Sequence, residues 1–200
     1  GNKTTAMPPV PHLYIYNGST GVNTCVHDLG LWMIFHLNNC KVNGKALVSP
    51  AQLAQTRKPH VQAKNLKPDD IQFPASRMSQ IHYGMGWFLG HYGEGHVKVP
   101  FLNHMGGSAG VRSLVTLVPE QNLGIIIVSN FGSMRVSMLP EALRNKFLDL
   151  YLNLSEKDWS RENLQQMEDV RIKNKQYKNA YRLQNPRAPH DLKVYIGKYT

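Results

Sequence analysis

Two short apolar runs joined by a turn constrain the fold of this 200-residue chain more than any other feature. Residues 114–118 are rich in Val, Leu and Thr, and residues 125–128 form a continuous β-branched stretch. Between them, Pro119, Glu120, Gln121 and Asn122 supply turn chemistry, and a glycine at 124 lets the chain re-enter a strand. The pattern predicts a buried antiparallel hairpin at the centre of a sheet.

A glycine-rich bend leads into this hairpin, and it contains the sequence His104-Met105-Gly106-Gly107-Ser108. Glycines permit a close approach of the backbone to a ligand, because they carry no side chain that would block it. An imidazole and accessible backbone N–H groups at the mouth of a buried hairpin therefore form the first candidate site.

In their order along the chain, these residues resemble the β-lactamase-related serine hydrolases, which include class C β-lactamases and low-molecular-weight penicillin-binding proteins. The third active-site motif of that family is Lys-Thr-Gly or a His-x-Gly variant, and His104-Met105-Gly106 matches the variant. Residues 21–29, 49–53 and 83–87 follow the family's order as well. The resemblance covers residues 20–135.

The resemblance implies roles for five residues. His104 acts electrostatically near the substrate or its proton shuttle, and the Gly107 N–H stabilises the oxyanion. Met105, Gly106 and Ser108 contact the substrate. Met105 departs from the usual Thr or Ser, which favours ester or peptide substrates over β-lactams. Reasoning from the residues alone leaves two alternatives for Ser108 and Arg112: substrate contacts, or a bend residue and a solvated strand end.

The family's nucleophile is absent from this sequence. Its serine lies in Ser-x-x-Lys, and no serine here has a lysine three positions later. The Tyr-x-Asn spellings at Tyr151 and Tyr177 follow His104 and lie in helical patterns, so we interpret them as chance. The resemblance thus implies a C-terminal fragment, inactive alone, of an enzyme whose helical half carries the serine. The alternative is a non-catalytic cell-envelope binding module.

The predicted fold class is α+β, with an antiparallel sheet flanked by helices. Residues 1–154 would belong to the β-lactamase/transpeptidase-like domain, 155–190 to a helical linker, and 191–200 to the first strand of a truncated accessory β domain. Strands are expected at residues 83–89 and 97–101 with a turn at 90–95, and residues 58–80 are expected to form a loop.

Capping residues and periodicity predict four helices. They begin at an N-cap Thr24, at Ser49-Pro50, at Pro140, and in the polar segment 155–183 anchored by Trp159. The helix after Thr24 should end at Asn38-Asn39, before a turn at residues 42–45. The apolar stripes expected to be buried are Leu29, Trp32, Met33, His36 and Leu37 in the first helix, and Leu143, Phe147, Leu150, Tyr151 and Leu154 in the third.

Composition and residue spacing limit the kinds of partner that we expect this chain to bind. The net charge is +10. We nevertheless expect no nucleic-acid partner, because the basic residues are not interleaved with the aromatic side chains typical of nucleic-acid-binding proteins. Histidine and cysteine spacing predicts no metal or other cofactor. No apolar run is long enough to span a membrane. Helix length separates Cys25 from Cys40 too far for a disulfide. The expected partners are a small-molecule or peptide substrate and the missing helical half, in a bacterial periplasm or cell envelope as the resemblance implies.

Overall fold

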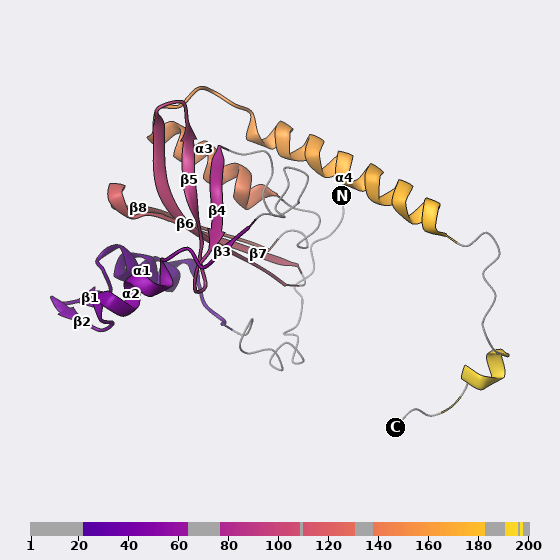
Figure 1. Cartoon of the computed structure of the whole chain (residues 1–200), viewed down its shortest axis with the longest axis horizontal. Helices are drawn as coiled ribbons and strands as arrows, with labels where there is room; N and C mark the ends of the chain where they lie inside the picture. Colours follow the sequence, from indigo (N-terminus) through magenta and orange to yellow (C-terminus); the bar gives the residue numbers. More distant parts are fainter. Residues whose placement is uncertain are drawn as a thin grey trace.

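The computed structural model describes residues 22–63, 77–108, 110–130, 138–182, 191–195 and 197. In this part of the chain, a six-stranded antiparallel sheet is flanked by helices, and a two-stranded hairpin lies beside it (Figure 1). The predicted α+β class is therefore confirmed. Parts of the predicted domain, linker and C-terminal strand lie outside the described residues: 1–21, 64–76, 109, 131–137, 183–190, 196 and 198–200.

The six strands of the large sheet lie side by side in their sequence order, and each pairs antiparallel with the next. They are β3 (Val61–Gln62), β4 (Met78–Tyr83), β5 (Phe88–Glu94), β6 (Val97–Ser108), β7 (Val111–Val118) and β8 (Leu123–Ser129). The predicted hairpin is confirmed as β7 and β8, but its predicted place at the centre of the sheet is wrong: β8 is the last strand in the order of the described sheet, and its residues are mostly only partly buried. A 3₁₀ turn, η2 (Pro119–Gln121), and Asn122 in the left-handed conformation connect β7 and β8.

Two sequence predictions in the first half of the sheet are wrong. Residues 83–89 do not form one strand, because the chain turns back between β4 and β5, where the Gly84 N–H donates to the Trp87 carbonyl. Residues 90–94 belong to β5 instead of a turn. Gly90 serves packing there: an added Cβ would lie 2.6 Å from Cδ1 of Ile81. The predicted loop at 58–80 contains β3 and the start of β4, and its residues 64–76 lie outside the described part.

Each face of the sheet carries its own apolar cluster. On one face Leu148 of α3 (Leu139–Tyr151) packs against sheet residues Tyr92, Val99, Phe101 and Val118. On the other face, Met33 and Leu37 of α1 (Val26–Leu37) pack against a cluster comprising Trp87, Leu89, Leu102 and Leu117. The sheet is thus a layer between α3 and α1.

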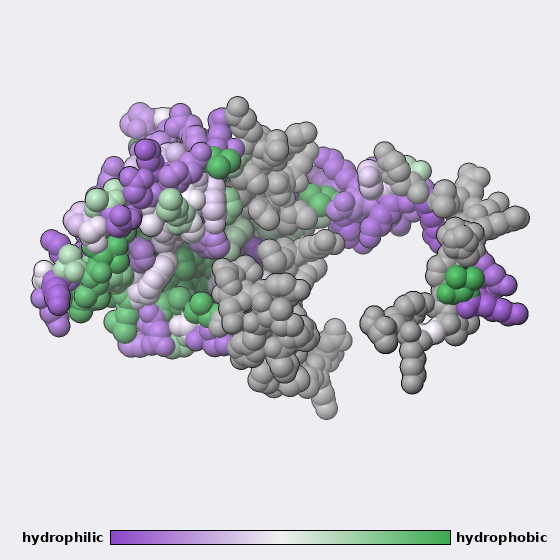
Figure 2. All heavy atoms as spheres, turned by 60° about the horizontal axis from the view of Figure 1, so that its bottom comes forward, coloured by the Kyte–Doolittle hydropathy of each residue, from purple (hydrophilic) through white to green (hydrophobic). Residues whose placement is uncertain are grey.

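Helix α1 covers its face of the sheet only in part. Its N-cap is Cys25, one residue after the predicted Thr24, and it ends before Asn38 as expected. None of its residues is fully buried, so the burial predicted for its stripe is only partial. Its outer side exposes four large apolar side chains: Val26, Leu31, Trp32 and Ile34. Figure 2 shows hydrophobic side chains gathered on the surface of the sheet-and-helix body. A helix that is apolar on several sides is usually covered by further protein.

The segment after α1 follows its local sequence signals. Asn43 and Gly44 both have positive φ and join β1 (Lys41–Val42) to β2 (Lys45–Ala46), as the predicted turn requires. Helix α2 (Pro50–Thr56) begins at Ser49, whose hydroxyl accepts a hydrogen bond from the Gln52 N–H. Cys25 is exposed and Cys40 buried, and both are free thiols.

Helix α3 lies where it was predicted but is rotated relative to the prediction. Leu143, Leu150 and Tyr151 of the expected buried stripe are exposed, and Phe147 and Leu154 are only partly buried. Besides Leu148, the buried residues of α3 include four polar or charged ones that recur at helical spacing: Glu141, Arg144, Asn145 and Asp149. We call these four residues the polar seam. The apolar pattern failed because each seam residue has a polar partner.

Asp149, the last residue of the polar seam along α3, holds the start of α4 (Trp159–Tyr181) against the sheet and α3. Asp149 accepts hydrogen bonds from Oη of Tyr92, at 2.7 Å, and from Nε1 of Trp159, at 2.6 Å. Burial and this contact raise the pKa of the Tyr92 phenol, which stays neutral. Trp159 is the anchor that the sequence predicted, and α4 then extends away from the sheet (Figure 1).

The C-terminal prediction differs from the structure. Residues 192–195 of the expected strand form a 3₁₀ turn, η3 (Leu192–Tyr195), in which Asp191 accepts a hydrogen bond from the Lys193 N–H. A strand needs a partner strand, whereas this turn forms its hydrogen bonds locally. No helix in the described part of the chain combines the length and apolar character needed to cross a membrane.

The orientation of α3 gives the first prediction. Leu148 is 1% exposed and Leu150 is 70% exposed. Leu148→Ala should lower the free energy of unfolding by about 2–5 kcal/mol, because it leaves a cavity against the sheet. Leu150→Ala, the matched control, should change it by less than about 0.5 kcal/mol. Urea denaturation of both variants measures this difference, and a larger effect at Leu150 would contradict the observed rotation.

Candidate functional site

The candidate site lies at the end of β6, which is longer than its neighbour β5. Pairing between β5 and β6 runs from Glu94↔Val97 to Phe88↔Asn103. On its other side β6 stays paired with β7 as far as Ser108↔Val111. Residues 104–108 therefore extend beyond Phe88, the first residue of β5. Because successive N–H groups of a strand point to alternate sides, some N–H groups of this segment face the side that β5 no longer covers.

His104 contacts two aromatic residues at this end of the sheet. Its Nε2 lies 3.5 Å from Oη of Tyr83, and its ring stacks on Phe88 with centroids 6.1 Å apart. Tyr83 and Phe88 are register partners at the ends of β4 and β5, with ring centroids 4.7 Å apart. Sequence reasoning did not identify Tyr83 as a site residue. Only the register of three strands brings this hydroxyl to His104.

The surroundings of His104 keep its imidazole neutral at neutral pH. The residue is exposed, but neighbouring protein atoms partly remove its ring from water. This desolvation lowers the pKa of His104 below 6.5, and a hydrogen bond with the Met105 backbone opposes the shift. A neutral ring has one donor nitrogen and one acceptor nitrogen, so it can exchange a hydrogen bond with the Tyr83 hydroxyl in either direction.

The other predicted residues are brought together by the strand itself. Gly106 pairs with Ser113, whose Oγ would lie 2.6 Å from an added Cβ at position 106. Gly106 thus leaves room for the Ser113 hydroxyl, a group that the sequence prediction did not include. Gly107 pairs with Arg112, and Ser108 with Val111. Met105 pairs with the buried Leu114, and strand alternation directs its side chain to the face opposite His104.

Arg112 matches neither of its two predicted alternatives. It is neither solvated nor open to a substrate, because its side chain is buried and its Nη2 contacts Oε1 of Glu141. This ion pair links β7 to the first turn of α3. Sequence spacing gave no indication of it, because the two residues are 29 positions apart.

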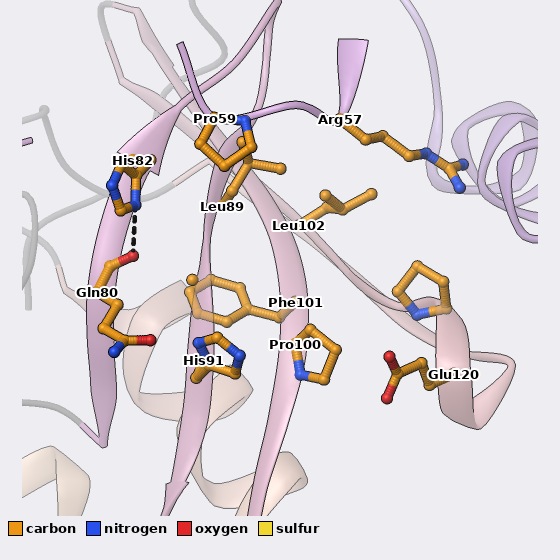
Figure 3. Close-up of a pocket in the computed structure, with 12 residues that line it drawn as sticks. Arg57, Pro59, Gln80, His82, Leu89, His91, Pro100, Phe101, Leu102 and Glu120 are labelled. Carbon is orange, nitrogen blue, oxygen red and sulfur yellow. Dashed lines mark hydrogen bonds between the residues drawn. The ribbon is translucent and has the colours of Figure 1, made fainter. Parts of the chain in front are cut away.

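A separate hollow of about 420 Å³ lies lower on the sheet, between Arg57 and Pro59 after α2 and Pro119 and Glu120 of η2 (Figure 3). Its floor is mostly apolar, and His104 is not among its lining residues. Two of its polar groups have internal partners: Arg57 donates to the His36 carbonyl at 2.8 Å, and His82 is within 2.9 Å of the Gln80 carbonyl. The charged side chains that line the hollow are Arg57 and Glu120.

The described residues contain no group of three or more His, Cys, Asp or Glu side chains that could hold a metal ion. What the end of β6 offers instead is a neutral imidazole beside a phenol, glycines without side chains, and backbone N–H groups. These groups can donate hydrogen bonds to a developing negative charge and can relay a proton.

The pKa of His104 gives the second prediction. In an NMR titration, its ring signals should have a midpoint below 6.5. Phe88→Ala should raise the midpoint toward 6.5, because it admits water to the ring. Tyr83→Phe, the matched control, preserves the ring packing and should leave the midpoint below 6.5.

The same shift has a defined sign in stability. Between the folded pKa and 6.5 the unfolded chain binds more protons at this residue, so its contribution to stability falls as pH decreases through that window. A wild-type midpoint at or above 6.5 would contradict the assigned environment.

The chain is similar to one known protein family. The family model described as Beta-lactamase matches residues 1–145 of the 200-residue chain. No curated protein and no solved structure matches the chain significantly. The match covers the sheet and most of α3, including every residue of the candidate site. The chain therefore belongs to the β-lactamase family, which supports a function of the serine-hydrolase type.

Proposed function

We propose that this chain supplies the oxyanion side of a serine-hydrolase active site that cleaves an amide or ester through an acyl-enzyme. The observation that carries this proposal is the extension of residues 104–108 beyond β5, with His104 against Tyr83 at its base. A carbonyl substrate needs such an open strand edge, because its oxygen must reach a backbone N–H.

In the proposed reaction, a serine oxygen from outside residues 1–200 attacks the carbonyl carbon. The carbonyl oxygen becomes negatively charged and accepts a hydrogen bond from the Gly107 N–H. The oxyanion then collapses, the carbon–nitrogen or carbon–oxygen bond breaks, and the amine or alcohol leaves with the proton that the serine hydroxyl gave up. Water attacks the resulting acyl group, releases the acid and restores the serine. The neutral His104 and the Tyr83 hydroxyl would stabilise the changing charge or pass the proton.

The exposed side of α1 supports the proposal that a further helical half completes the site. Trp32, Leu31 and Ile34 present an apolar surface on the helix that covers the other face of the sheet from α3. We propose that the helical half with the nucleophile packs on this surface. Without it, the chain lacks the Ser-x-x-Lys motif and should be inactive.

We propose D-amino-acid peptides or β-lactams as the substrate class, with class C enzymes and penicillin-binding proteins as the nearest types. Met105 in place of a hydroxyl residue favours a peptide or ester. The bacterial periplasm or cell envelope is the proposed location. The alternative, a non-catalytic binding module that uses the same strand edge, is an outcome of the next experiment.

The third prediction concerns covalent labelling. A fluorescent penicillin and a fluorescent phosphonate should not label the 200-residue chain, because it lacks the nucleophile. A longer protein that adds an upstream Ser-x-x-Lys segment should be labelled by at least one probe, and mutation of that serine to Ala should abolish labelling. Reversible binding without labelling by the longer protein would contradict the enzyme and support the binding module.

The fourth prediction concerns His104. In the active longer protein, His104→Ala should lower kcat/KM by about a hundredfold, since it removes a group beside the reacting atoms. The side chain is exposed, so the unfolding midpoint should remain close to that of the parent. His82→Ala, a histidine in the separate hollow, is the control and should leave turnover unchanged. Unchanged activity in His104→Ala would remove the proposed role.

A further inference from the structure

We propose that the buried ion pair Arg112–Glu141 positions the strand segment that contains Gly107, so that α3 acts on the active site without touching the substrate. This inference rests on the proposed function. Its structural basis is the register of β6 and β7: Arg112 lies opposite Gly107, one pair before the last pair of that ladder, Ser108↔Val111.

Position 112 is the point at which a side chain can control this segment. Arg112 lies on the central strand of three, opposite Gly107 on one side and Ser129 on the other. Gly107 has no side chain to pack, so its place depends on the backbone beside it. Arg112 fixes that backbone, because its guanidinium contacts the buried carboxylate of Glu141 at the start of α3.

A second contact from α3 secures the other end of the same segment. Nη1 of Arg144 donates to Oδ1 of Asn103 at 3.2 Å, and Oγ1 of Thr116 donates to the same oxygen at 2.7 Å. Asn103 directly precedes His104. The predicted site residues 104–107 thus lie between two points at which buried polar groups tie the sheet to α3.

Stability alone is a poor explanation for the Arg112–Glu141 pair. Nε of Arg112 and Oε2 of Glu141 are buried without a hydrogen-bond partner among the described residues. Burying charges with incomplete hydrogen bonding is costly, and apolar replacement of both members of such a pair is often neutral or stabilising. What an apolar pair would not supply is a directed contact between one atom of β7 and one atom of α3. Positioning is the property that this contact adds.

The test uses the ¹⁵N-labelled 200-residue chain and the double variant Arg112→Met/Glu141→Leu, which leaves no unpaired buried charge. We expect its urea midpoint to stay near that of the parent. The backbone order parameters of Gly106 and Gly107 should fall from the rigid value of about 0.85 to below about 0.6. Asp149→Asn is the control. It weakens the other end of the polar seam and should leave these two glycines rigid.

In the active longer protein, the double variant should lower kcat about tenfold with little change in KM, because substrate contacts persist while the oxyanion donor is displaced. Rigid glycines and unchanged kcat in a folded double variant would overturn the proposal. If the double variant fails to fold, Arg112→Lys, which keeps the charge but loses the planar fork, replaces it with the same expected shifts. The order parameters need no activity, so failure of the proposed function and failure of this inference give different results.

Discussion

The structure depends on one constraint: helix α3 faces the sheet with polar side chains, and each needs a specific partner. Arg144 is 1% exposed and donates to Asn103, Glu141 contacts Arg112, and Asp149 accepts from Tyr92 and Trp159. Rotating α3 to bury Leu143 and Leu150 instead would remove the α3 contacts of Arg112 and Asn103, which are buried in the sheet, and buried polar groups without partners cost more than exposed apolar surface. The seam therefore determines the rotation of the helix and, through Trp159, where α4 begins.

The polar seam also contacts residues next to the proposed site: Arg144 bonds to Asn103, and Glu141 pairs with Arg112. Strand β6 contributes both to the apolar core, through Val99 and Phe101, and to the open edge, through residues 104–108. One continuous strand thus contains both buried core residues and the residues of the proposed site. Residues 104–108 of β6 have no partner in β5. In our proposal they are held in place by their pairing with β7 and by the polar contacts from α3. In the proposed site, a substrate would approach this segment from the side that β5 leaves unpaired, opposite its pairing with β7.

How far the sequence predicted this arrangement depended on the range of the interactions. The pairing and turn of the β7–β8 hairpin, the Ser49 cap and the end of α1 were correct, because turn and capping residues act within a few positions. The central place of the hairpin was wrong, because strand order depends on long-range pairing. The face of α3 was wrong, because apolar periodicity cannot detect polar residues whose partners lie in distant strands. The β4–β5 boundary was wrong because glycines mark both turns and close packing, and Gly90 serves packing. The His104 motif was found as local sequence, whereas Tyr83 required strand register.

The two faces of the sheet differ in how well they are covered. This difference suggests how the chain could pair with a further part of its domain. On the α3 side, an apolar cluster is buried together with the polar seam, whose contacts to the sheet are specific. On the α1 side, a helix with apolar residues around its circumference leaves Trp32 and its neighbours exposed. Apolar surface of this kind gains stability from burial by almost any well-fitting partner, whereas the polar seam accepts only one arrangement. The seam therefore defines the geometry of the strand that carries His104, and the apolar side is suited to receive the half that we propose brings the nucleophile. In the division that we propose, catalysis would belong to the assembled domain, and this chain would contribute the strand against which the reacting carbonyl is held.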